Sequence, residues 1–187
     1  VISVVSMTAF GQDIRRSYQA DADNSSVTWK GFKVTGSHHG TINIESGSLQ
    51  FNNDILAGGE FSVDMTSMKC VDLDEKNGAK LIGHLSSPDF FNIQEYPTAK
   101  IKITSVASRG PVGEYKVTAD VTIKDNTSEV KFLANVNFEG RTATAELEID
   151  RSEFDVKYGS GSFFQNLGDK TIYDEFKMGI SLVMLKD

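Results

Sequence analysis

Apolar and polar residues alternate with a period of two through residues 114–150, which is typical of antiparallel strands with one buried and one solvated face. Polar turn residues at Asp125-Asn126 and Glu139-Gly140 divide this stretch into three expected strands. Their apolar faces carry Val117, Ala119, Val121 and Ile123, then Val130, Phe132, Ala134, Val136 and Phe138, then Ala143, Ala145, Leu147 and Ile149. The pattern predicts a curved antiparallel meander.

Alanine recurs on the apolar face of this meander, at positions 119, 134, 143 and 145. Small side chains that face inward leave volume unfilled, whereas a protein interior normally fills its volume. The face therefore predicts a barrel whose bore holds an apolar ligand. The alternative is an ordinary core, filled by Phe132, Phe138, Leu147 and Phe176.

Short strand patterns also flank the meander. They are expected over 18–22 and 26–32, then around Ile42 and Ile44, Leu49 and Phe51, Phe61 to Met65, and Ala99 to Ile103. Between them we expect a loop or bulge at Gly36-Ser37-His38-His39-Gly40 and turns at Glu45-Ser46-Gly47 and Asn52-Asn53-Asp54. The last strand, from Ile172 to Met184, is long enough to pair with the first one and remove the sheet edge.

The period changes between Asp74 and Leu85, where Leu81, Ile82 and Leu85 share one helical face. Asp74 or Asn77 is available as the helix cap. Phe90 and Phe91 follow the helix closely, and exposing both rings to water would be unfavourable. We expect these two rings to fasten the helix-loop insertion onto one mouth of the barrel.

The 187 residues predict one domain with a sizeable core. The net charge of −7 argues against nucleic acid or an anionic membrane surface as the main partner. Cys70 is the only cysteine, so no intrachain disulfide is expected, and an inert buried thiol is the expected role.

Residues 1–11 are apolar and uncharged but too short to span a bilayer. Ala9 and Gly11 are small residues at the spacing of a cleavage site before Gln12, which predicts a residual signal-peptide segment over 1–11 and a single domain over 12–187. An ordinary strand or a leader is the alternative.

Several motifs resemble the YceI-like family of polyisoprenoid-binding, lipocalin-like proteins. They are Gly36-Ser37-His38-His39-Gly40, Gly58-Gly59-Glu60-Phe61-Ser62-Val63-Asp64-Met65, His84-Leu85-Ser86-Ser87-Pro88-Asp89-Phe90-Phe91, Glu95-Tyr96-Pro97-Thr98-Ala99 and Ile149-Asp150-Arg151-Ser152-Glu153-Phe154. The motif with the double phenylalanine is the most specific of these. The chain departs from the family at Asp155, where glycine is more frequent.

The resemblance implies an all-β fold: an extended antiparallel lipocalin-like β-barrel of about eight strands, with the short helix-loop insertion at one mouth. It also implies export to the periplasm or secretion, and a long-chain isoprenoid, quinone or fatty-acid-like ligand in the bore. Homodimers occur among such proteins. No cofactor, no metal, no nucleic-acid partner and no stable membrane insertion are expected.

Most candidate ligand contacts are apolar. The expected barrel wall comprises Phe61, Met65, Ile101, Ile103, Val121, Phe132, Ala134, Val136, Phe176 and Ile180. Leu85, Phe90 and Phe91 are expected to gate the mouth, and His39, His84, Asp89 and Arg151 are the candidate polar contacts. Non-catalytic binding, transport or storage of the ligand is the favoured function.

Two alternatives stay open. One is a lipid-modifying enzyme that uses His39 or His84 with Asp64 or Asp89. A metal site is not favoured, because His38 and His39 are neighbours on extended chain and are expected to point to opposite faces. For His84 and Asp89, the simpler interpretation is that they fasten the helix-loop to the barrel by hydrogen bonds. The other alternative is a stress-related scaffold, which predicts a solid core.

Overall fold

The computed structural model describes residues 14–185, so the expected signal-peptide segment 1–11 lies outside the described residues. The strands are β1 (Arg15–Gln19), β2 (Ser26–Lys33), β3 (Gly36–Asn52), β4 (Ile55–Cys70), β5 (Thr98–Ser108), β6 (Glu114–Ile123), β7 (Asn126–Asn137), β8 (Thr142–Asp150) and β9 (Glu175–Val183). The helices are α1 (Glu75–Ser86) and the 3₁₀ helices η1 (Arg151–Phe154) and η2 (Gly168–Lys170).

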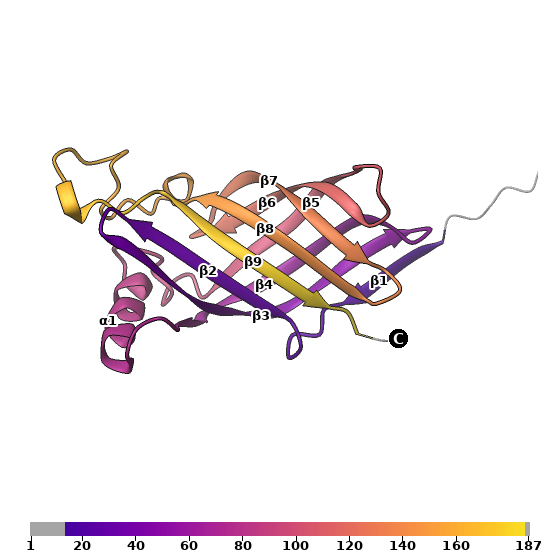
Figure 1. Cartoon of the computed structure of the whole chain (residues 1–187), viewed down its shortest axis with the longest axis horizontal. Helices are drawn as coiled ribbons and strands as arrows, with labels where there is room; N and C mark the ends of the chain where they lie inside the picture. Colours follow the sequence, from indigo (N-terminus) through magenta and orange to yellow (C-terminus); the bar gives the residue numbers. More distant parts are fainter. Residues whose placement is uncertain (1–13, 186–187) are drawn as a thin grey trace, which may run out of the picture.

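Eight of these strands close into an antiparallel barrel (Figure 1). Strands β3 to β9 each pair with the next along the chain, and β9 also pairs with β2, which pairs with β3. The short β1 is an extra strand on β3. The predicted barrel and the closure by the last strand are therefore confirmed, with β2 rather than β1 as the partner of β9.

The alternation over residues 114–150 places the predicted apolar face inside the barrel. Val117 and Val121 on β6 are almost fully buried, as are Leu147 and Ile149 on β8. Small residues meet inside as well, because Ala134 on β7 pairs directly with Ala145 on β8. The first turn lies one residue earlier than predicted, at Lys124-Asp125, where both residues have positive φ. A two-residue turn of this kind suits a tight hairpin.

Two predicted interruptions of the third strand are wrong, because β3 runs unbroken from Gly36 to Asn52. The chain turns instead at residues 34–35. Gly40 stays in the strand, where a Cβ would meet the ring of Trp29 at 2.6 Å and the carbonyl oxygen of Lys69 at 1.7 Å. At 45–47 the register with β4 shifts, and the ring of Phe61 occupies the space above Gly47. These glycines allow close approach within a sheet rather than a turn.

The predicted helix forms at one end of the barrel, with Asp74 as its cap. The Asp74 side chain accepts a hydrogen bond from the backbone N–H of Asn77 at 3.2 Å. Figure 1 shows α1 at the opposite end of the barrel from β1. The two ends of the bore therefore differ.

An aromatic cluster closes the end of the barrel at β1. Tyr18, Phe51 and Phe138 pack edge to face, with ring centroids 5.1–5.8 Å apart. Tyr18 and Phe51 are buried. Aromatic pairs in this arrangement contribute beyond their burial. The bore is consequently filled at this end by rings, and any entrance lies toward α1.

Candidate functional site

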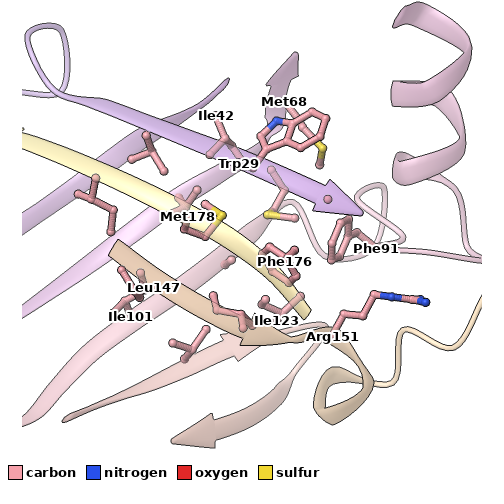
Figure 2. A pocket seen from close by; sticks show the side chains of 18 of the residues that line it. Trp29, Ile42, Met68, Phe91, Ile101, Ile123, Leu147, Arg151, Phe176 and Met178 are labelled. Carbon is pink, nitrogen blue, oxygen red and sulfur yellow. The ribbon is translucent and has the colours of Figure 1, made fainter. Parts of the chain in front are cut away.

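A cavity of about 560 Å³ occupies the interior of the barrel. Residues from every strand of the closed barrel line it, together with residues of α1 and of the segments that follow α1 and β8. Figure 2 shows side chains such as Trp29, Met178 and Leu147 pointing into a common space, with Arg151 at the end near α1. This volume is within the range of small-molecule sites in proteins.

All ten residues predicted for the barrel wall line this cavity: Phe61, Met65, Ile101, Ile103, Val121, Phe132, Ala134, Val136, Phe176 and Ile180. The recurrent alanines contribute as expected, since Ala134, Ala143 and Ala145 lie along the lining. Ala119 is fully buried but is not part of the lining. The small residues of β7 and β8 therefore border unfilled space.

The predicted gate residues Leu85, Phe90 and Phe91 also line the cavity, at the α1 end. Phe90 is buried and packs edge to face on Phe91, with centroids 5.0 Å apart. Phe91 in turn approaches the ring of Phe176 on β9 at 6.4 Å. The two rings thus fasten the helix-loop insertion to the barrel, as the sequence predicted.

Arg151 is a buried cation at this end of the cavity, and the surrounding chain occupies most of its guanidinium. Its nitrogens donate hydrogen bonds to the carbonyl oxygens of Tyr173, Val156 and Ile172, at 2.9–3.2 Å. The Nη2 atom also pairs with Asp174 at 3.1 Å. Burial lowers the pKa of Arg151, while the nearby carboxylates oppose that shift. Arg151 consequently holds the 155–174 segment against the barrel.

His84 projects from α1 between two aromatic rings. Its imidazole lies edge to face with Tyr158 at 4.4 Å and with Phe90 at 5.7 Å. Its Nε2 atom is shielded from solvent and has no hydrogen-bond partner among the described residues. The expectation that His84 fastens the loop by hydrogen bonds is therefore wrong for this atom. Asp89, the other residue expected to do so, is exposed and is not part of the lining.

Asp72 gathers a polar cluster outside the predicted set. Its carboxylate accepts hydrogen bonds from the Cys70 thiol and from the backbone N–H of His39, each at 3.1 Å. The Nδ1 atoms of His38 and His39 lie 3.0 and 3.9 Å from its Oδ2. The expectation of opposite faces holds, since His38 lines the cavity whereas the His39 side chain is 54% exposed and does not. Asp72, which follows the end of β4, nevertheless lies within 4 Å of both imidazoles.

The charge state of this cluster follows from its contacts. Burial alone would raise the pKa of Asp72, but the hydrogen bonds from His39, Cys70 and His38 hold it well below its ordinary range. Burial and the neighbouring Asp72 carboxylate raise the pKa of the Cys70 thiol, which favours an unreactive thiol. Across residues 14–185, no group of three or more His, Cys, Asp or Glu side chains has the arrangement of a metal site.

The residues of the enzymatic alternative are not joined by contacts. Within the described part of the chain, no hydrogen bond or ion pair connects His39 or His84 to Asp64 or Asp89. Asp64 instead accepts hydrogen bonds from the backbone N–H and the hydroxyl of Thr66, at 2.9 and 2.6 Å. His39 lies beside Asp72, and only His84 of the four lines the cavity. General acid–base work by a histidine–carboxylate pair needs the two groups within hydrogen-bond reach of each other or of a shared substrate.

Several lining residues were missed by the sequence reasoning. They come from the irregular segment between β8 and β9 and from the end of β2, and they are Tyr158, Asp169, Lys170, Ile172, Tyr173 and Lys33. Lys33, Asp169 and Lys170 are exposed at the rim. The aromatic residues on both sides of Gly159 and Gly161 could have indicated that this segment contacts the cavity. The segment has no regular alternation of apolar and polar residues, however, so the sequence does not identify which of its side chains face inward.

Comparison with known proteins agrees with this architecture. The family model of the YceI-like domain matches residues 18–184. A UPF0312 protein of Pseudomonas putida strain F1 is 29% identical over 168 residues, which cover 84% of each chain. A second UPF0312 protein, from Photorhabdus laumondii, is 34% identical over 103 residues, which cover 55% of this chain and 50% of that one.

Solved structures share the fold. Burkholderia cenocepacia BcnA superposes with a TM-score of 0.68 at 24% identity, covering 87% of this chain and 98% of that chain. A polyisoprenoid binding domain from Saccharophagus degradans, implicated in plant cell wall breakdown, gives a TM-score of 0.57 at 13% identity and covers 88% of this chain and 95% of that chain. The match of the family model over nearly the whole described chain decides the assignment. This protein belongs to the family of YceI-like domains.

Proposed function

We propose that this protein binds one long-chain apolar molecule inside the barrel and carries or stores it without chemical change. The cavity supports this proposal most strongly, since it is an unfilled space of about 560 Å³ lined almost entirely by aliphatic and aromatic side chains. Each methylene moved from water into such a lining contributes about 0.8 kcal/mol. A long tail therefore binds tightly without many polar contacts.

A polyisoprenoid, an isoprenoid quinone or a fatty-acyl compound has the required shape. The bore is long, because β3 and β4 have 17 and 16 residues, and the aromatic cluster of Tyr18, Phe51 and Phe138 ends it. The likeness to the polyisoprenoid binding domain of Saccharophagus degradans favours the same ligand class. Export to the periplasm or secretion is part of the proposal and rests on the family resemblance and the composition of residues 1–11.

The alternatives have less support. A catalytic role requires convergent groups, and the histidines and carboxylates expected for it make separate contacts. A scaffold role predicts a solid interior, whereas small residues here border open space. Among residues 14–185, no helix has the length and hydropathy to cross a membrane.

Extraction of natively purified protein with organic solvent, followed by mass spectrometry, tests the proposal. We expect a long-chain lipid in stoichiometric amount, or, if the protein purifies empty, saturable uptake of added isoprenoid alcohols or quinones. Heat-denatured protein carried through the same extraction is the control for adventitious lipid. An empty extract together with no saturable uptake would contradict the proposed function.

A further inference from the structure

His84 is the polar side chain of the cavity whose bonding is incomplete. It lines the cavity from α1, and its Nε2 atom is buried with no partner in the described part of the chain. The rings of Phe90 and Tyr158 flank the imidazole, and neither residue makes a hydrogen bond to this atom. Buried polar atoms in folded proteins almost always have a hydrogen-bond partner, so an exception within a cavity marks a place where a ligand atom can bind.

We propose that the ligand carries a small uncharged hydrogen-bonding group at one end, a hydroxyl or a carbonyl, and that this group binds Nε2 of His84. The inference rests on the proposed function and specifies which of its ligand classes the cavity selects. An imidazole nitrogen donates or accepts according to its tautomer, and a hydroxyl serves either case. A carbonyl serves the tautomer with the proton on Nε2.

An anionic end group does not suit this position, because none of the described arginine and lysine side chains that line the cavity is both buried and uncommitted. The guanidinium of Arg151 already donates to three carbonyl oxygens and pairs with Asp174. The two lysines of the lining, Lys33 and Lys170, are exposed at the rim. The exposed Asp169 immediately precedes Lys170 in the chain and also belongs to the lining. Burying a carboxylate or diphosphate without a paired cation is strongly unfavourable.

The placement of His84 also orients the ligand. His84 belongs to the α1 end, whereas Tyr18, Phe51 and Phe138 close the other end with apolar rings. Between them the lining is apolar and includes Val27, Ile42 and Leu182. The tail therefore extends toward the aromatic cluster, and the polar end stays beneath Phe90 near the entrance.

Three probes with the same twenty-carbon chain test the inference: geranylgeraniol, the corresponding hydrocarbon without the hydroxyl, and geranylgeranyl diphosphate. A twenty-carbon chain is about the shortest that contacts several wall residues along one strand, because a β-strand rises about 3.3 Å per residue. We expect delipidated wild-type protein to bind the alcohol about tenfold more tightly than the hydrocarbon, the change in Kd that one well-placed hydrogen bond supplies. The diphosphate should bind more weakly than the alcohol.

The variant His84→Leu removes the hydrogen-bonding atom and keeps an apolar side chain. It should bind the hydrocarbon as the wild type does and lose the preference for the alcohol, while His84→Gln should retain part of that preference. Ligand-free His84→Leu should unfold at no lower urea concentration than the wild type, since the variant also removes a buried unpaired atom. This stability measurement identifies a variant that has merely failed to fold.

The outcomes separate the inference from the proposed function. Binding of the hydrocarbon by a wild type that shows no preference for the alcohol, or a preference that survives in His84→Leu, would overturn the inference and leave the proposed function standing. Tightest binding of the diphosphate would overturn it in the same way. Failure of the wild type to bind any of the three probes would overturn both.

Discussion

Filling the bore is predicted to have opposite effects on ligand binding and on stability. The substitution Ala134→Leu adds three carbon atoms to a residue that lines the cavity and pairs with Ala145 across the β7–β8 ladder. Complete burial of these atoms in open space would stabilise the ligand-free fold by up to about 2.4 kcal/mol, at about 0.8 kcal/mol for each carbon. If the new side chain displaces two methylenes of the ligand, binding weakens by about 1.6 kcal/mol, or somewhat more than tenfold.

Ala119→Leu is the matched control for this variant. Ala119 lies on the inward face of neighbouring β6 and is fully buried, but it does not border the cavity. The same three carbons there should destabilise the fold by about 1–3 kcal/mol, as overpacking does in a solid core. Urea denaturation and titration with a fluorescent long-chain alcohol measure the two effects. A loss of 1–3 kcal/mol in Ala134→Leu with unchanged binding would refute the view that β7 borders an open bore.

Three further predictions concern the α1 end of the barrel. Phe90→Ala removes a buried ring and should cost about 3–5 kcal/mol of the free energy of unfolding, measured by urea denaturation; a cost below about 1 kcal/mol would show that the ring does not fasten the insertion. Asp174→Asn leaves the buried Arg151 without its carboxylate and should cost about 3–5 kcal/mol in the same assay; a cost below about 1 kcal/mol would show that the pair does not hold this segment. Hydrogen bonds lower the pKa of Asp72 in the folded state, so its carboxylate should stabilise the fold above about pH 4 and lose that contribution as the pH falls. In Asp72→Asn, the free energy of unfolding should therefore fall less steeply with decreasing pH on the acid side. An unchanged pH dependence in this variant would contradict the prediction.

The barrel and its wall were predictable because only the direction of each side chain was needed. A period of two fixes which residues of a strand share a face, and an apolar face must be buried, so Val121, Ala134 and Ile180 could be assigned to the interior without any tertiary information. The ends of strands were less predictable. Glycines at 40 and 47 resemble turn signals, but in β3 they make room for Trp29 and Phe61 from neighbouring strands.

Contacts distant in sequence account for what was missed. Asp72 receives its partners from His38 and His39, more than thirty residues earlier, and nothing local to Asp72 indicates this. The segment after η1 lines the cavity without any period, so Tyr158 and Tyr173 could not be assigned. The departure from the family at Asp155 has a local explanation, since φ there is +59°, a conformation in which glycine is unstrained and aspartate is tolerated.

The most direct test of an apolar bore uses the single tryptophan of the chain, Trp29, which lines the cavity and donates its indole N–H to the carbonyl oxygen of Thr41 at 3.2 Å. A long-chain alcohol brominated along its tail quenches a tryptophan that it contacts. Titrating delipidated protein with this probe should quench Trp29 fluorescence to saturation at one molecule per chain, and an unbrominated competitor should restore the emission. Quenching that rises without saturation, or none at all, would contradict a ligand tail inside the barrel.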